Sequence, residues 1–181
     1  MDLQHLNVRI FATRHDIDLG EAIPVFQRWI QDSVCEELLI DVADYRHVPN
    51  GPGVLLAAHQ ANYTFDGASL TYHRKAVVEG TNQDKLLQAF FAALEACRRL
   101  EDDFGGGLQF NGGRCEVAVN DRLLAPNTVG TWQALEPDFR TFFDNLFGHG
   151  AYQLEHRGGP RELFRVSVES DSLVTVSSVT P

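Results

Sequence analysis

The chain contains 181 residues, of which 44% are hydrophobic and 22% are charged. This length fits one globular domain, and the even spread of apolar residues excludes intrinsic disorder and collagen-like repetition. Fifteen Lys and Arg against 25 Asp and Glu give a formal net charge of −10. Because a negative field repels phosphate backbones and anionic headgroups, we expect neither nucleic acid nor a membrane surface as a partner.

Two further features concern the compartment. The N-terminal residues Met1–His5 lack the basic start and apolar core of a secretory signal, and no stretch approaches the roughly 18 apolar residues of a membrane-spanning helix. We therefore expect a soluble, cytoplasmic protein. Cys35, Cys97 and Cys115 are widely spaced and form no C-x-x-C pair, so we expect reduced thiols, with the latter two packed in the interior.

The first half of the chain alternates between strand and helix signals. Hydrophobic periodicity, capping patterns and turn residues define these elements. In chain order they are a strand over 8–12, a helix over 19–33, three strands forming two hairpins within 37–78, and an amphipathic helix over 81–102.

The second half follows the three glycines at 105–107, which mark the best internal boundary. An Asn-Gly-Gly turn at 111–113 predicts a hairpin, and Pro137 predicts a kink in the next helix. The elements are a hairpin of 108–110 with 114–119, a helix over 128–147, and a hairpin of 151–157 with 161–169.

The predicted order is β-α-β-β-β-α followed by β-β-α-β-β. This order favours an α+β fold, in which about three helices cover an antiparallel sheet built from hairpins, over a doubly wound parallel sheet. We expect a single domain over 1–181, with 1–104 and 108–181 as two structural halves.

Histidines in the predicted hairpins raise the question of a metal site. Strand alternation over 55–65 puts His59 on the apolar face with Tyr63. The Asp66-Gly67 turn pairs Asn62 with His73 and Thr64 with Thr71, which puts His73 on the opposite, polar face. One tetrahedral site using both histidines is then excluded, and no cofactor is predicted. A metal-binding module of Asp41, His47 and His73 is the weakest hypothesis, because no ligand spacing supports it.

An Asp-His pair is the main catalytic hypothesis. Pairing across the Asn50-Gly51 turn places His59 opposite Val42 and diagonal to Asp44. The candidate catalytic residues are therefore Asp44, His59 and Tyr63, with His59 as a general base or ligand contact. The same pair is also how a core histidine has its hydrogen bonds satisfied, and that structural interpretation is the favoured one.

The polar face of the same hairpins is a candidate surface for a ligand. Its residues are Asp41, Tyr45, His47, Asn62 and His73. An ordinary solvated face is the common alternative for an antiparallel sheet.

The leading functional hypothesis is a non-catalytic binding or assembly domain that forms a homodimer. Twelve Phe and two Trp exceed what one side of each helix needs, so the surplus could line a self-association surface or an apolar pocket. Alternatively, all of them fill one core. The second hypothesis is a small-ligand binder or enzyme centred on Asp44, His59 and Tyr63.

Overall fold

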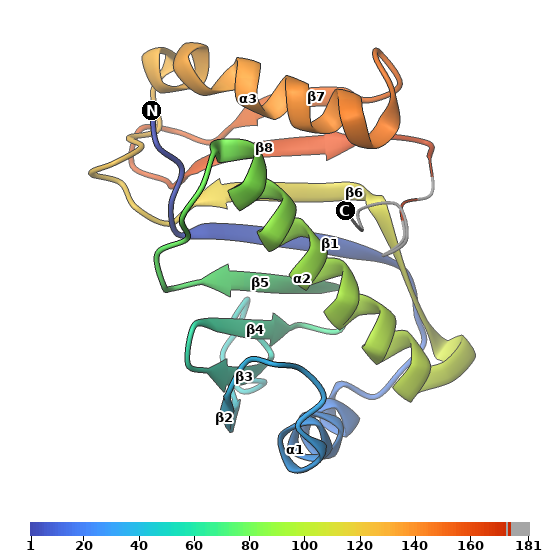
Figure 1. The fold of residues 1–181 in the computed structure, drawn as a ribbon. Helices are drawn as coiled ribbons and strands as arrows, with labels where there is room; N and C mark the ends of the chain where they lie inside the picture. The colour runs from blue at the N-terminus through green and yellow to red at the C-terminus, as the bar shows by residue number, and fades with distance from the viewer. Residues whose placement is uncertain (173, 175–181) are drawn as a thin grey trace.

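The computed structural model describes residues 1–172 and 174, and in these residues it forms one eight-stranded sheet with its helices on one side (Figure 1). The strands are β1 (Leu6–His15), β2 (Leu39–Asp44), β3 (Val54–Ala58), β4 (Ala61–Phe65), β5 (Ser69–Arg74), β6 (Leu108–Val119), β7 (Gln153–Arg157) and β8 (Phe164–Glu169). The helices are α1 (Ala22–Asp32), α2 (Asn82–Phe104) and α3 (Val129–Phe147), with short 3-10 turns before α1 and after α2.

The sheet is antiparallel throughout, in the order β2-β3-β4-β5-β1-β6-β8-β7. The α+β class and the antiparallel sheet with about three helices are thus confirmed. β1 pairs with β5 on one side and with β6 on the other, so the two predicted halves share one sheet. Their relation as structural halves stays a prediction.

All three predicted helices form, and each is preceded by a side-chain cap. Asp18 accepts a hydrogen bond from Gly20 N at the turn before α1, and Thr128 accepts one from Thr131 N at the start of α3. Thr81 and Asp84 form a reciprocal capping box at the start of α2. These caps satisfy backbone N–H groups that have no partner inside a helix.

One face of the sheet is apolar and packs against the helices. A row across it runs through residues that the strand registers place opposite one another: Val42, Leu56, Tyr63, Tyr72, Val8, Val117 and Val166. The other face carries the next residues along each strand, including Asn62 and His73. Alternation along a strand thus separates a core face from an open, polar face.

The helix phenylalanines fill this core. Phe90 of α2 contacts Phe142 and Phe143 of α3 with ring centroids 5.6 and 6.1 Å apart, and Phe139 lies 6.2 Å from Phe164 of β8. All five are buried. The structure therefore favours the one-core interpretation of these aromatic residues over a self-association surface.

The region 37–78 contains four strands, not three. His59 and Gln60 form a two-residue turn between β3 and β4, so 55–65 is not one continuous strand. The turn reverses the parity: in β3 the even-numbered residues Val54, Leu56 and Ala58 face the core, whereas in β4 the odd-numbered residues do.

The predicted hairpin at 108–119 is also wrong, because β6 is one continuous strand that pairs with β1 along its length, with two register shifts. Gly112 and Gly113 allow another segment of the chain to pack closely against the backbone of β6. A Cβ at Gly113 would lie 2.5 Å from the Ser172 carbonyl oxygen, and one at Gly112 would lie 2.8 Å from that of Val174. Glycine is thus needed for packing against this segment, not for a turn.

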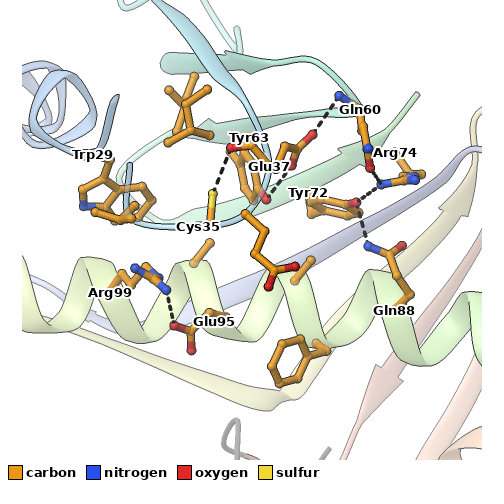
Figure 2. Close-up of a pocket in the computed structure, with 17 residues that line it drawn as sticks. Trp29, Cys35, Glu37, Gln60, Tyr63, Tyr72, Arg74, Gln88, Glu95 and Arg99 are labelled. Carbon is orange, nitrogen blue, oxygen red and sulfur yellow. Dashed lines mark hydrogen bonds and ion pairs between the residues drawn. The ribbon is translucent and has the colours of Figure 1, made fainter. Parts of the chain in front are cut away.

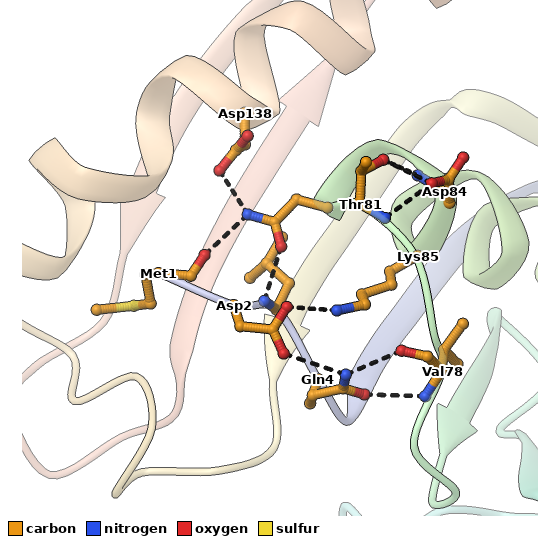
Figure 3. A network of polar contacts seen from close by, with 10 residues as sticks. Met1, Asp2, Gln4, Val78, Thr81, Asp84, Lys85 and Asp138 are labelled. Atoms are coloured by element: carbon orange, nitrogen blue, oxygen red, sulfur yellow. Dashed lines mark hydrogen bonds and ion pairs between the residues drawn. The ribbon is translucent and has the colours of Figure 1, made fainter.

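The N-terminal residues are tied to the start of α2 and to α3 (Figure 3). Asn82 accepts a hydrogen bond from Leu3 N at 2.8 Å and donates to Asp138 of α3 at 2.7 Å. Lys85, only 4% exposed, forms an ion pair with Asp2. This network joins the beginning of the chain to two helices that come much later in sequence. Among the described residues, no helix combines the length and apolar character that crossing a membrane requires.

Candidate functional site

A pocket of about 370 Å³ lies between α2, the core face of the sheet and the segment that follows α1 (Figure 2). Its apolar walls are formed by Trp29, Leu39, Leu56, Phe91 and Ala92. Its volume is at the lower end of the range for small-molecule pockets, which are concave and mostly apolar with a few convergent polar groups.

One face of α2 supplies a wall of the pocket. Gln88, Phe91, Glu95 and Arg99 recur at intervals of three and four residues, which places them on the same side of a helix. Glu95 and Arg99 form an ion pair at 2.8 Å. Gln88 and Phe91, which take no part in this ion pair, face the sheet across the pocket.

Tyr72 and Gln88 form a buried polar contact between the sheet and α2. The Tyr72 hydroxyl, on a side chain only 1% exposed, accepts hydrogen bonds from Gln88 Nε2 at 3.0 Å and from Arg74 Nη1 at 3.4 Å. Gln88 Oε1 is buried and accepts no hydrogen bond from the residues that the structure describes. Such an acceptor costs free energy unless a donor reaches it.

Glu37 and Tyr63 form a second polar group at the pocket. Glu37 accepts hydrogen bonds from the Gln60 backbone N at 2.8 Å and from the Tyr63 hydroxyl at 3.2 Å. Burial, together with the nearby Glu37 carboxylate, raises the pKa of Tyr63 far above its usual value. The Tyr63 hydroxyl therefore stays protonated and acts as a donor.

Cys35 lies beside this group and donates a weak hydrogen bond from Sγ to the Glu37 carbonyl oxygen at 3.6 Å. Burial raises the pKa of this thiol. Cys97 and Cys115 are free and buried elsewhere in the core, and burial raises their thiol pKa values too. At neutral pH none of the three is activated as a thiolate nucleophile.

Of the three catalytic candidates, only Tyr63 lies in this pocket. His59 is exposed in the β3–β4 turn, and Asp44 is exposed at the far end of β2, where Arg46 pairs with it at 2.7 Å and lowers the pKa of its carboxyl to about 2. Asp44 is opposite Val54, whereas His59 follows Ala58, so the two lie roughly 13 Å or more apart along β3. The predicted Asp44–His59 pair is therefore wrong, because the turn at His59 was missed and the register was displaced with it.

The ligand candidates on the polar face are only partly brought together. Tyr45, Asn62 and His73 line a second, larger groove on the open face of the sheet, whereas Asp41 and His47 do not line it. The predicted pairing of Asn62 with His73 is confirmed. No cluster of three or more His, Cys, Asp or Glu side chains suited to a metal occurs among the described residues, so Asp41, His47 and His73 do not converge there.

His73 is held as a neutral side chain in that groove. Its Nε2 lies 2.9 Å from Thr64 Oγ1, and burial lowers the pKa of its imidazole to about 4. Asn62 Oδ1 is buried without a hydrogen-bond donor from the described residues. This groove is the open-face alternative to the pocket beneath α2.

The sequence interpretation missed Glu37, Arg74 and Gln88 as pocket residues. One signal was available: Gln88 and Glu95 interrupt the apolar stretch of α2 and lie seven residues apart, on the same helix face. Nothing in the sequence indicated which strands this face would meet. Comparisons with protein-family models, curated proteins and solved structures found no match for the chain.

Proposed function

We propose that this chain is a non-catalytic binding domain that holds a small, partly apolar molecule in the pocket beneath α2. The observation that carries the proposal is a concave site of about 370 Å³ in which apolar walls surround a few convergent polar groups, among them Glu37, Tyr63 and Arg74. A small ligand could hydrogen-bond to these polar groups, while its apolar part would lie against the partly exposed Phe91 and Ala92 of α2.

Binding is favoured over catalysis by the state of the titratable groups. The Tyr63 phenol and the Cys35 thiol both have raised pKa values, so neither is a base or nucleophile at neutral pH. His59, the expected general base, lies outside the pocket. The groups in the pocket thus fit hydrogen bonding and recognition.

Native mass spectrometry of the gently purified protein tests this proposal. We expect a stoichiometric small-molecule adduct on the wild type. Ala92→Phe fills the pocket from α2 and should abolish the adduct, whereas Ala57→Phe, which adds the same side chain outside the pocket on the open face of β3, should retain it. The proposal is wrong if no adduct forms or if the Ala92→Phe variant keeps it.

Self-association is a second candidate function, and the sheet edge favours it. β2 is one of the two outermost strands, and Leu38 and Ile40 at this edge are 66% and 55% exposed. Unpaired apolar edge strands tend to pair with another chain. We expect a dimer by size-exclusion chromatography with light scattering, and a monomer for Ile40→Lys; a monomeric wild type would rule this candidate out.

A further inference from the structure

Two opposite charges line the pocket beneath α2, and neither is neutralised by an ion pair within the described residues. Glu37 and Arg74 accept and donate hydrogen bonds only with neutral groups. Of the other charged residues at the pocket, Glu95 pairs with Arg99, and Glu36 has no ion pair within the described residues but is exposed. Among the partly buried pocket residues that the structure describes, Glu37 is thus an unpaired anion and Arg74 an unpaired cation.

Gln60 holds these two charges apart at fixed positions. Its backbone N donates to Glu37 Oε1 at 2.8 Å, and its side-chain Oε1 accepts from Arg74 Nη1 at 3.1 Å. Figure 2 shows Glu37, Gln60 and Arg74 in sequence along one side of the pocket. Glu37 and Arg74 are thus separated by a single glutamine, which keeps them from pairing with each other.

Both charged groups retain hydrogen-bonding capacity. In the guanidinium of Arg74, Nε donates to the Ala76 carbonyl and Nη1 to Gln60 and Tyr72, while Nη2 donates to no acceptor among the described residues. The Glu37 carboxylate accepts two hydrogen bonds, and a carboxylate has about four acceptor positions. A ligand could therefore give a donor to Glu37 and an acceptor to Arg74 at once.

The apolar wall completes the description of the ligand. Phe91 and Ala92 of α2 are partly exposed and line the pocket, opposite the buried Leu56 of β3. Building on the binding function proposed above, we propose that the ligand is an α-amino acid with an apolar side chain. Its ammonium group would meet Glu37, its carboxylate would meet Arg74, and its side chain would lie against the apolar wall, with charge-assisted hydrogen bonds at both ends.

Isothermal titration calorimetry with L-leucine tests the ligand class. Two analogues test each charged group on its own. 4-Methylpentanoate lacks the ammonium group, and 3-methylbutylamine lacks the carboxylate. We expect L-leucine to bind and each analogue to bind at least roughly tenfold more weakly, because each loses a hydrogen bond to a charged group. Equal affinities for all three would overturn the proposal.

Charge-removing variants assign each end of the ligand. Glu37→Gln should weaken L-leucine roughly 10- to 100-fold and leave 4-methylpentanoate unchanged, since that analogue has no ammonium group. Arg74→Gln should weaken L-leucine and 4-methylpentanoate and leave 3-methylbutylamine unchanged. Glu79→Gln and Arg46→Gln are the matched controls, because Glu79 is exposed and does not line the pocket, and Arg46 pairs with Asp44 outside it.

The outcomes separate this inference from the function on which it rests. If the Ala92→Phe variant loses a native adduct but L-leucine does not bind the wild type, the pocket binds a ligand and the amino-acid assignment is wrong. If the wild type shows neither an adduct nor L-leucine binding, both proposals fail. If Arg74→Gln does not fold, the two analogues on the wild type still decide the matter.

Discussion

The hydrogen bond between Tyr72 and Gln88 allows a sharp test of the polar network in the pocket. Tyr72→Phe removes the oxygen that accepts from Gln88 Nε2 at 3.0 Å and from Arg74 Nη1 at 3.4 Å. Gln88 then has no partner for either end of its amide within the described residues. Leaving a buried donor unpaired costs about 1–3 kcal/mol, so we expect Tyr72→Phe to destabilise the protein by that amount.

Gln88→Met should behave differently, although it breaks the same hydrogen bond. It removes the donor together with the unpartnered acceptor and keeps a side chain of similar length, so we expect a change in stability of about 1 kcal/mol or less in either direction. In the double variant no amide is left unpaired. Its destabilisation should therefore be smaller than the sum of the two single effects, with a coupling of about 1–2 kcal/mol.

Urea denaturation followed by circular dichroism measures all four proteins of this cycle. With an m-value of about 1–3 kcal/mol/M, the expected loss in Tyr72→Phe appears as a clear decrease in the urea midpoint. Additive effects, within about 0.5 kcal/mol, would refute the reasoning, because they would show that Tyr72 and Gln88 do not depend on each other.

Three further predictions concern the core, the open face and the N-terminal network. Phe143→Ala should lower the free energy of unfolding by about 3–5 kcal/mol and Tm by roughly 6–20 °C in a thermal melt, because the ring is fully buried; a change under 1 kcal/mol would contradict its place in the core. Because burial lowers the pKa of His73 to about 4, the unfolded chain binds more protons than the folded protein between pH 6.5 and 4. Stability should therefore fall by up to about 3 kcal/mol as the pH decreases through this range, and His73→Gln, but not the exposed His59→Gln, should flatten the dependence measured by urea denaturation. Asp2→Asn should lower Tm more than Lys85→Met, because it leaves the buried ammonium of Lys85 unpaired whereas the methionine removes it; the reverse order would contradict the ion pair.

The sequence predictions were accurate where the signal lies within a short segment of the chain. The helix beginning near Thr81 was predictable because its cap and its apolar spacing lie within a few residues of one another. The pairing of Asn62 with His73 was predictable for the same reason, since Asp66 accepts hydrogen bonds from Ala68 N and Ser69 N within the turn itself. A turn that contains its own stabilising contacts determines the register of the hairpin it closes.

The errors arose where a local pattern fitted two structures. Asn111-Gly-Gly113 has the composition of a hairpin turn, yet these glycines remain in β6 because another part of the chain approaches their backbone. His59 and Gln60 carry no strong turn signal, so the reversal between β3 and β4 was missed. In both regions the decision depends on which distant segments pack alongside.

In the pocket, too, the local features were readable from the sequence, whereas the contacts between distant segments were not. The sequence alone determined the α+β class, the three helices and the presence of a polar residue, Gln88, on the apolar face of one helix, because periodicity and capping depend on neighbours in the chain. Only the tertiary structure brought Glu37 to Tyr63, 26 residues apart, and Gln88 to Tyr72, 16 residues apart. Such contacts depend on the order of strands in the sheet and on which helix covers them, and these are decided by burial of the whole core rather than by any single segment.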